Sequence, residues 1–218
     1  LPLGKNRVGK TPISLRSTFS NLSLQFIHKF IPKFFTLGGD LSGSFHLKGI
    51  PANTQFTYDF DVQNGLFDSI ELGHVFGNGS YDGRRLFVKK VEATHPDGKI
   101  TAQGSVPFDF NINSPSIGRF FPGDSLDFHV LAQMGSLPFL TPYIADLDSV
   151  RGDMDISLSL TGPVESIQRS GHIKVKNGKI YTLLTADPAT SVEGEAFMNH
   201  NQLVIQDLVT TLYHSNGK

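Results

Sequence analysis

The stretch from Asp153 to Leu160 reads Asp-Met-Asp-Ile-Ser-Leu-Ser-Leu and decides the fold class. Acidic and hydroxyl side chains alternate with aliphatic ones. Because successive side chains of a strand point to opposite faces, this period of two predicts a strand with one polar and one apolar face. Gly162-Pro163 then ends the strand. We therefore expect a mostly β protein, built on an antiparallel sheet that is apolar on one side.

The same pattern occurs earlier in the chain, since the segment 13–66 returns at a constant offset of 113 residues as 126–179. Leu86 and Val88 align best with Leu203 and Ile205, at an offset of 117. The pairs that fix the first offset are Gly39-Asp40 with Gly152-Asp153, Gly49 with Gly162, and Asn64-Gly65 with Asn177-Gly178. Two copies of one unit favour an elongated scaffold over a catalytic domain.

Each copy also contains four apolar residues that step by three or four positions, which predicts one short amphipathic helix per copy. These helices are expected at about residues 22–35 and 136–148. The apolar positions are Leu24, Ile27, Ile31 and Phe34 in the first copy and Leu137, Leu140, Ile144 and Leu147 in the second.

Turns are predicted wherever Asn or Asp precedes Gly, because both residues of such a pair tolerate positive φ angles. Strands are expected at residues 86–91, 100–106 and 203–212. The expected hairpin turns are Asn64-Gly65, Asn78-Gly79, Asp82-Gly83, Asp97-Gly98 and Asn177-Gly178.

The copies divide the chain into residues 13–125 and 126–218, with a junction in the Pro-, Ser- and Asn-rich stretch 107–122. We expect both copies to belong to one continuous sheet. Asn216-Gly217-Lys218 matches Asp97-Gly98-Lys99, so the second copy is expected to be truncated at its C-terminal end and the chain to be part of a longer protein.

Composition excludes several functions for the 218 residues. The net charge is −1 with no block of Lys and Arg, which argues against nucleic acid as a partner. There is no cysteine for a disulfide or thiolate metal site, and the eight histidines are scattered without metal-ligand spacing. No catalytic residue, metal site or cofactor is therefore predicted, and the expectation is a protein that is not an enzyme.

The order of the motifs resembles the TamB/AsmA-like family of bacterial envelope proteins. The resemblance rests on Val150-Arg151-Gly152-Asp153 leading to Gly162-Pro163, followed by the segment from Gly171 to Ile180. It covers nearly the whole chain twice, although Gly49-Ile50-Pro51 replaces the plain Gly-Pro in the first copy.

The resemblance implies a curled sheet that forms an open trough, also called a half-pipe or β-taco. It implies a parent protein anchored in the inner membrane of a diderm bacterium and crossing the periplasm. The implied role is phospholipid transport between inner and outer membranes and outer-membrane biogenesis. An outer-membrane barrel of the insertion machinery is the implied protein partner, through parts of the protein outside these 218 residues.

The alternation itself requires something apolar to cover one face of the sheet, either a second layer or a ligand. The leading hypothesis is a groove for phospholipid acyl chains. The alternatives are a closed β-sandwich core and a structural or adhesive β-repeat module that binds protein or glycan. The predicted groove lining is Leu41, Phe45, Leu47, Phe60, Val62, Met154, Ile156, Leu158, Leu160, Ile173, Val175, Leu203 and Ile205.

Overall fold

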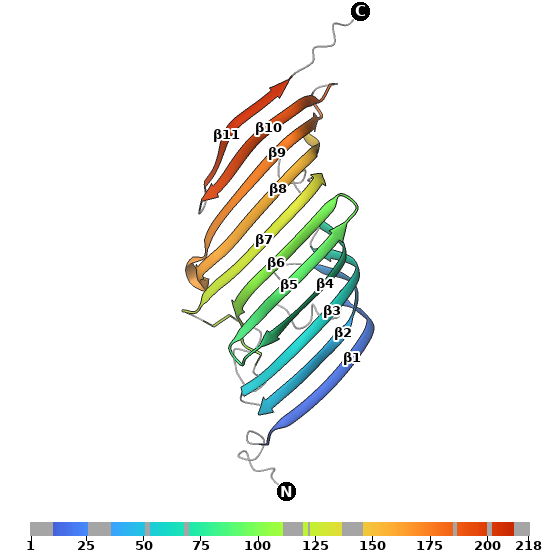
Figure 1. The fold of residues 1–218 in the computed structure, drawn as a ribbon, viewed down its shortest axis with the longest axis vertical. Coiled ribbons are helices and arrows are strands. Elements are labelled where there is room, and N and C mark those ends of the chain that lie inside the picture. The colour runs from blue at the N-terminus through green and yellow to red at the C-terminus, as the bar shows by residue number, and fades with distance from the viewer. Residues whose placement is uncertain are drawn as a thin grey trace, which may run out of the picture. The chain divides into compact units, whose positions relative to one another are not determined.

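A computed structural model of the protein describes residues 11–25, 36–50, 53–67, 70–110, 120–121, 123–136, 146–184, 187–199 and 202–211. These residues form an eleven-stranded sheet in which the order of the strands is their order in the chain (Figure 1). The strands are β1 (Ile13–Ser23), β2 (Leu37–Ile50), β3 (Asn53–Phe67), β4 (Ile70–Tyr81), β5 (Arg85–His95), β6 (Gly98–Pro107), β7 (Ser125–Ser136), β8 (Leu147–Pro163), β9 (Gln168–Thr182), β10 (Ala189–Asn199) and β11 (Gln202–Thr211).

This confirms the prediction of a mostly β protein with an antiparallel sheet. β1 to β4 pair antiparallel with their neighbours, as do β9 to β11. The chain divides into two compact units. Unit 1 comprises residues 1–93, 102–128 and 161–167, and unit 2 comprises residues 94–101, 129–160 and 168–218.

The predicted helices lie largely on residues 26–35 and 137–145, outside the described part of the chain. Among the described residues at their ends, Leu22 and Ser23 belong to β1, Ser136 to β7 and Leu147 to β8, whereas residues 24–25 form a short 3-10 turn. Leu22 pairs with Leu41 in β2. The helix prediction is therefore wrong for the residues that belong to strands, because hydrogen bonding to a neighbouring strand overrides the local spacing of apolar residues. The described residues contain no α-helix.

Two of the predicted turns are found, since Asp82-Gly83 lies between β4 and β5, and Asp97 lies in the turn between β5 and β6, with Gly98 as the first residue of β6. The three Asn-Gly turns are wrong. Asn64-Gly65, Asn78-Gly79 and Asn177-Gly178 all lie inside strands.

Asn64 and Asn177 have the expected positive φ, 54° and 52°, but they use it in β-bulges. Gln63 and Asn64 together oppose His74, between the pairs Val62–Val75 and Gly65–Gly73. A bulge needs the same left-handed residue that a tight turn needs, so the dipeptide alone does not distinguish the two.

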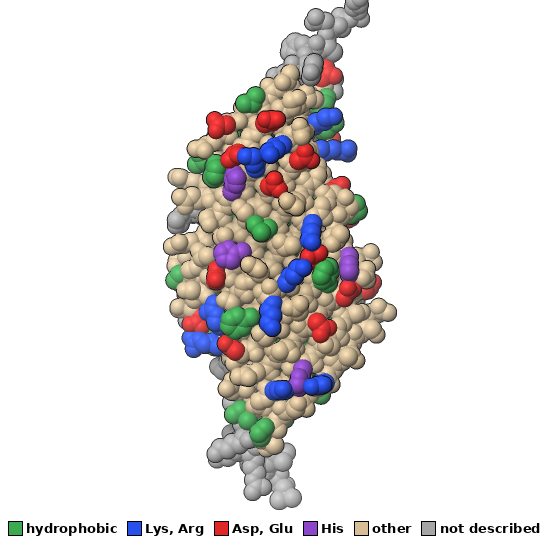
Figure 2. Space-filling model, viewed as in Figure 1, with side chains coloured by type: hydrophobic (Ala, Val, Ile, Leu, Met, Phe, Trp, Pro, Cys, Tyr) green, Lys and Arg blue, Asp and Glu red, His purple; other side chains and the backbone are tan. Residues whose placement is uncertain are grey.

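In unit 1 the two faces of the sheet differ in the way the alternation predicts. One row of paired residues is polar, and Ser44 Oγ donates to Asp59 Oδ1 at 2.6 Å. The next row pairs Leu41 with Val62 and Phe45 with Tyr58. On the face of the molecule seen in Figure 2, acidic, basic and histidine side chains are interspersed.

Packing within unit 2 centres on a small cluster of Ala132, Met134 and Met154, with Met154 only 2% exposed. Many other apolar side chains on the same strands keep contact with solvent. Ile205, for example, is 59% exposed. The apolar face is thus closed at this cluster and open elsewhere, so the open parts are where a ligand can bind.

Candidate functional site

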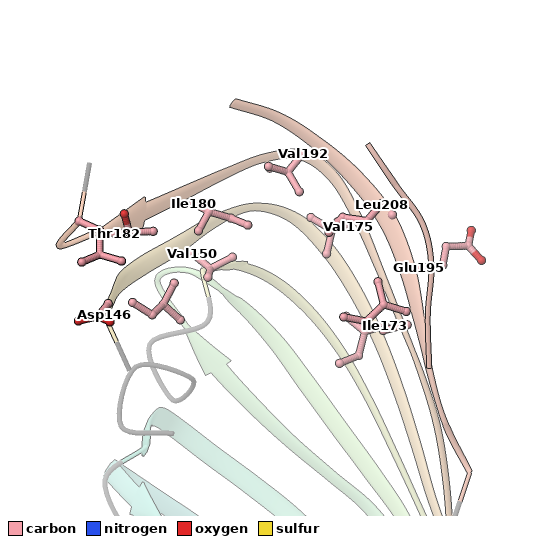
Figure 3. A pocket seen from close by; sticks show the side chains of 15 residues that line it. Asp146, Val150, Ile173, Val175, Ile180, Thr182, Val192, Glu195 and Leu208 are labelled. Carbon is pink, nitrogen blue, oxygen red and sulfur yellow. The ribbon is translucent and has the colours of Figure 1, made fainter. Parts of the chain in front are cut away.

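A hollow of about 460 Å³ lies on the apolar face of unit 2. Side chains from β8, β9, β10 and β11 project into it, whereas the carboxylate of Glu195 points away (Figure 3). Thr182 and Asp146 lie at one end of the hollow (Figure 3). The aliphatic side chains of its lining are Leu147, Val150, Ile173, Val175, Ile180, Leu184, Val192, Ala196, Ile205 and Leu208.

The hollow exists because large side chains face small ones across the strands. Ile173 in β9 pairs with Ala196 in β10, and Ala196 pairs with Ile205 in β11. Val175 pairs with Gly194. Small residues in the middle strand leave space between the larger residues on each side, and the lining remains aliphatic.

β-Bulges surround this hollow. Lys176 and Asn177 oppose Glu193, between the pairs Val175–Gly194 and Gly178–Val192. Ser191 and Asp207 also have positive φ, 52° and 51°, at the register shifts of β10 and β11. A bulge bends its strand and increases the local twist. Because bulges occur in three successive strands, they fix the direction in which the lining side chains point.

A second hollow of about 470 Å³ lies on the apolar face of unit 1. Its floor includes the row of pairs Leu41–Val62–Val75. Gly39 has φ 116°, and a Cβ there would lie 2.8 Å from Cγ1 of Val62, so the close approach of β2 to β3 requires glycine. The other apolar lining residues are Phe19, Leu24, Leu37, Phe45, Tyr58, Phe60, Leu66 and Leu72.

Aromatic rings pack beside this second hollow. The rings of Phe56 and Tyr81 are stacked with centroids 5.0 Å apart, and Phe110 meets both edge-on. The hydroxyl of Tyr81 accepts a hydrogen bond from the Phe110 amide at 3.2 Å. Tyr58 lies within the hollow itself, donates its hydroxyl to the Phe87 carbonyl at 3.3 Å, and has its pKa raised to about 12 by burial.

The two hollows use corresponding positions of the sequence. Val62 corresponds to Val175 and Gly65 to Gly178, at the offset of 113. Leu37 with Val150 and Phe60 with Ile173 are further such pairs. Four lining residues of each hollow are thus separated by 113 positions in the sequence. Val75 and Val192 line their hollows from different register positions, because Val75 pairs with Val62 whereas Val192 pairs with Gly178.

Charged groups lie on the opposite face. Asp61 Oδ2 and His74 Nε2 lie 2.5 Å apart in unit 1, and this hydrogen bond lowers the pKa of Asp61. In unit 2, Glu195 pairs with Lys174 and with His172, and these hydrogen bonds lower the pKa of Glu195. No group of three His, Asp or Glu side chains in the described ranges is arranged to hold a metal ion. The hollows are thus apolar sites without an evident set of reactive groups.

The predicted lining residues fall into three sets. Leu41, Phe45, Phe60 and Val62 line the hollow of unit 1, and Ile173, Val175 and Ile205 line the hollow of unit 2.

Met154 is buried in the cluster of unit 2, and Ile156 packs against that cluster.

Leu47, Leu158 and Leu160 are half-buried and line neither hollow. Leu203 belongs to β11 and pairs with Met198, but its side chain lies outside the described part of the structure.

Sequence reasoning missed the contribution of β4 and β10. Val75 in β4 and Val192 in β10 line the hollows and are almost fully buried. A signal for β10 was present, because Val192, Gly194 and Ala196 alternate with acidic residues. Leu184 had no such signal, since it lies in a connection rather than a strand.

Comparisons with protein-family models, with curated proteins and with solved structures gave no match to the chain. Within the described ranges, no helix is long and apolar enough to cross a membrane.

Proposed function

We propose that this chain is a periplasmic segment of a TamB/AsmA-like protein and that it carries phospholipid acyl chains along an apolar trough. In this proposal the chain is two copies of one repeat, residues 13–125 and 126–218, in an elongated sheet. The parent protein is anchored in the inner membrane and contributes to outer-membrane biogenesis. The family resemblance of the motifs supports the location.

One observation carries the proposal: both units have an open hollow of similar size, about 460 and 470 Å³, lined by aliphatic and aromatic side chains at equivalent positions. Both volumes are within the range of small-molecule sites, roughly 300–1,000 Å³. A ligand that fits such a site has to be apolar over most of its length.

The energetics favour an acyl chain. Each methylene group that passes through water costs about 0.8 kcal/mol, so a chain of about 16 carbons meets a barrier on the order of 12 kcal/mol. Aliphatic contacts lower that barrier without holding the ligand at one point. In unit 1 the polar residues nearest the hollow, Ser44 and Asp59, bond each other on the opposite face. The lining therefore suits a ligand that has to slide along the sheet rather than stay bound at one position.

The repeat part of the proposal is supported by backbone conformation. Gly39 and Gly152 have φ 116° and 140°, Gly49 and Gly162 have φ 115° and 94°, and Asn64 and Asn177 have φ 54° and 52°. Each pair is separated by 113 residues. Unusual backbone angles at equivalent positions are expected when two segments form the same supersecondary unit.

Mass spectrometry of organic extracts tests the proposal. The purified chain should carry phospholipid or detergent, and Ile173→Asp should reduce the amount bound. Leu131→Asp is the matched control, because Leu131 is 59% exposed and belongs to unit 2 but does not line the hollow. If extracts of the folded protein reproducibly contain no phospholipid or detergent, and the protein binds no fatty-acid probe, a lipid trough is excluded and the adhesive or structural module is favoured.

A further inference from the structure

Two adjacent leucines in the β9–β10 connection are unusually exposed. Leu183 is 74% and Leu184 is 76% exposed, the highest values among the large hydrophobic side chains that the structure describes. Neighbouring leucines open to water to this degree commonly mark a contact site. The pair Leu183–Leu184 is called the leucine tip below.

The leucine tip is held at the rim of the unit 2 hollow. The amide of Leu183 donates a hydrogen bond to the carbonyl of Asp146 at 2.9 Å, which ties the tip to the residue that precedes β8. Leu184 lines the hollow, together with Asp146 and Leu147. The exposed leucines are therefore continuous with the apolar lining.

The leucine tip also lies in a stretch that unit 1 lacks. The β9–β10 connection contains residues 183–188, whereas the equivalent β3–β4 connection contains only residues 68–69. The strand pairing shows the same lengthening, because Phe67 pairs with Ile70 whereas Ile180, its counterpart at the offset of 113, pairs with Ala189. A two-residue connection suffices to join such strands in unit 1, so joining β9 to β10 does not explain the added leucines.

We propose that the leucine tip docks on a lipid bilayer by inserting into the boundary between headgroups and acyl chains. Docking places the unit 2 hollow next to the acyl chains that it takes up or releases. The docking step stands on the exposed leucines alone, whereas its purpose rests on the function proposed above.

A bilayer fits the leucine tip better than a protein partner does. Protein interfaces of standard size bury about 800 Å² per partner and are anchored by aromatic residues and Arg. The tip offers two aliphatic side chains, and a fluid bilayer accepts these without a complementary surface. Asp146 and Asp187 flank the tip. Docking is therefore driven by apolar insertion rather than by attraction to anionic lipid, and zwitterionic phosphatidylcholine vesicles are the appropriate probe.

The chain contains no tryptophan, so a single introduced tryptophan reports on one position. With phosphatidylcholine vesicles, Leu183→Trp, at the tip residue that does not line the hollow, should show a blue-shifted emission that lipids brominated on the acyl chain quench. Leu131→Trp, on the other face of unit 2, should show neither effect. An equal response of both variants, or a response of neither, overturns the proposal.

Flotation with the same vesicles gives a second readout. The double variant Leu183→Asp, Leu184→Asp should reduce vesicle binding by more than about tenfold, because two apolar insertions are lost. Leu131→Asp should bind like the natural sequence. Thermal unfolding checks that each variant is folded. Unchanged flotation of the double variant overturns the proposal, as does a loss of self-association in place of vesicle binding.

A water-soluble fluorescent fatty acid separates this inference from the proposed function. The single variant Leu183→Asp should bind the soluble probe normally and lose only vesicle binding, because Leu183, unlike Leu184, does not line the hollow. If the natural sequence floats with vesicles but binds no soluble probe, the acyl trough fails and bilayer docking stands. If it binds the probe but not vesicles, docking fails and the trough stands.

Discussion

A charged residue placed in the unit 2 hollow should abolish acyl binding at a small cost in stability, whereas the same residue in the adjacent cluster should unfold the protein. The positions are Ile173, which is half-buried and lines the hollow, and Met154, which is 2% exposed in the cluster. Both side chains lie on the apolar face, so the two variants differ mainly in how far the substituted position is exposed to solvent.

The structure predicts different losses of folding stability for the two variants. Met154→Asp loses the burial of methionine, about 1.5–3 kcal/mol. It also buries a carboxyl group, roughly 1–3 kcal/mol on protein scales. The sum is about 3–6 kcal/mol. At position 173 the carboxylate stays hydrated, so Ile173→Asp loses about 1 kcal/mol for half a side chain and up to about 1 kcal/mol in strand preference.

Urea unfolding followed by circular dichroism measures the stabilities, and titration with a fluorescent fatty acid measures binding. Ile173→Asp should weaken binding more than about tenfold, because the acyl chain would have to desolvate the carboxylate. Leu131→Asp should change neither quantity. If Ile173→Asp destabilises the protein as much as Met154→Asp does, the hollow is a closed core and the reasoning fails.

Three further predictions concern other positions. Gly77→Ala should destabilise the protein by about 1–3 kcal/mol in urea unfolding, because its Cβ would lie 2.7 Å from the Lys90 carbonyl oxygen and 2.9 Å from the Phe60 ring; unchanged stability would contradict this packing. The pKa of Tyr58, raised to about 12 by burial, implies stability that is full below pH 10 and lost as pH rises to 12. That loss should be about 1–2 kcal/mol for a partly exposed phenol and absent in Tyr58→Phe, and an equal loss in that variant would refute the assignment. A photoreactive residue at Ile180, which lines the unit 2 hollow, should crosslink to acyl chains in cells and one at the exposed Lys179 should not, and equal labelling would show that the assigned face is wrong.

Regular alternation made the strands predictable. Successive residues of a strand lie on opposite faces of the sheet. When one face is buried and the other exposed along the whole strand, apolar and polar residues alternate in the sequence of every strand. The expected strands at 86–91, 100–106 and 203–212 correspond closely to β5, β6 and β11. Asp82-Gly83 and Asp97-Gly98 were recognisable as turns because each lies between two alternating runs.

The bulges were not predictable as bulges. The sequence indicates a positive φ at Asn64 and Asn177. It does not indicate whether the chain turns back there or continues as a bulged strand, since that depends on the pairing with the neighbouring strand. Asn64 continues because β3 pairs on both sides across this point, with β2 and with β4.

The candidate site was predictable only in part, for a related reason. Membership of the apolar face follows from alternation, and this brought Ile173 and Val175 into the prediction. Which part of that face stays open depends on residues far away in the sequence, such as Ala196 opposite Ile173. Met154 shares the predicted face but is closed off by Ala132 and Met134 from β7.

Two of the three Asn-Gly pairs that misled the turn prediction also locate the hollows. Gly65 and Gly178, each directly after an asparagine with positive φ, line the hollows of units 1 and 2. A bulge bends the strand, and the glycine beside it removes a side chain from the apolar face, so the two together open space where a regular strand would close it. In this chain the two Asn-Gly pairs whose asparagine has a positive φ therefore mark the positions of the hollows.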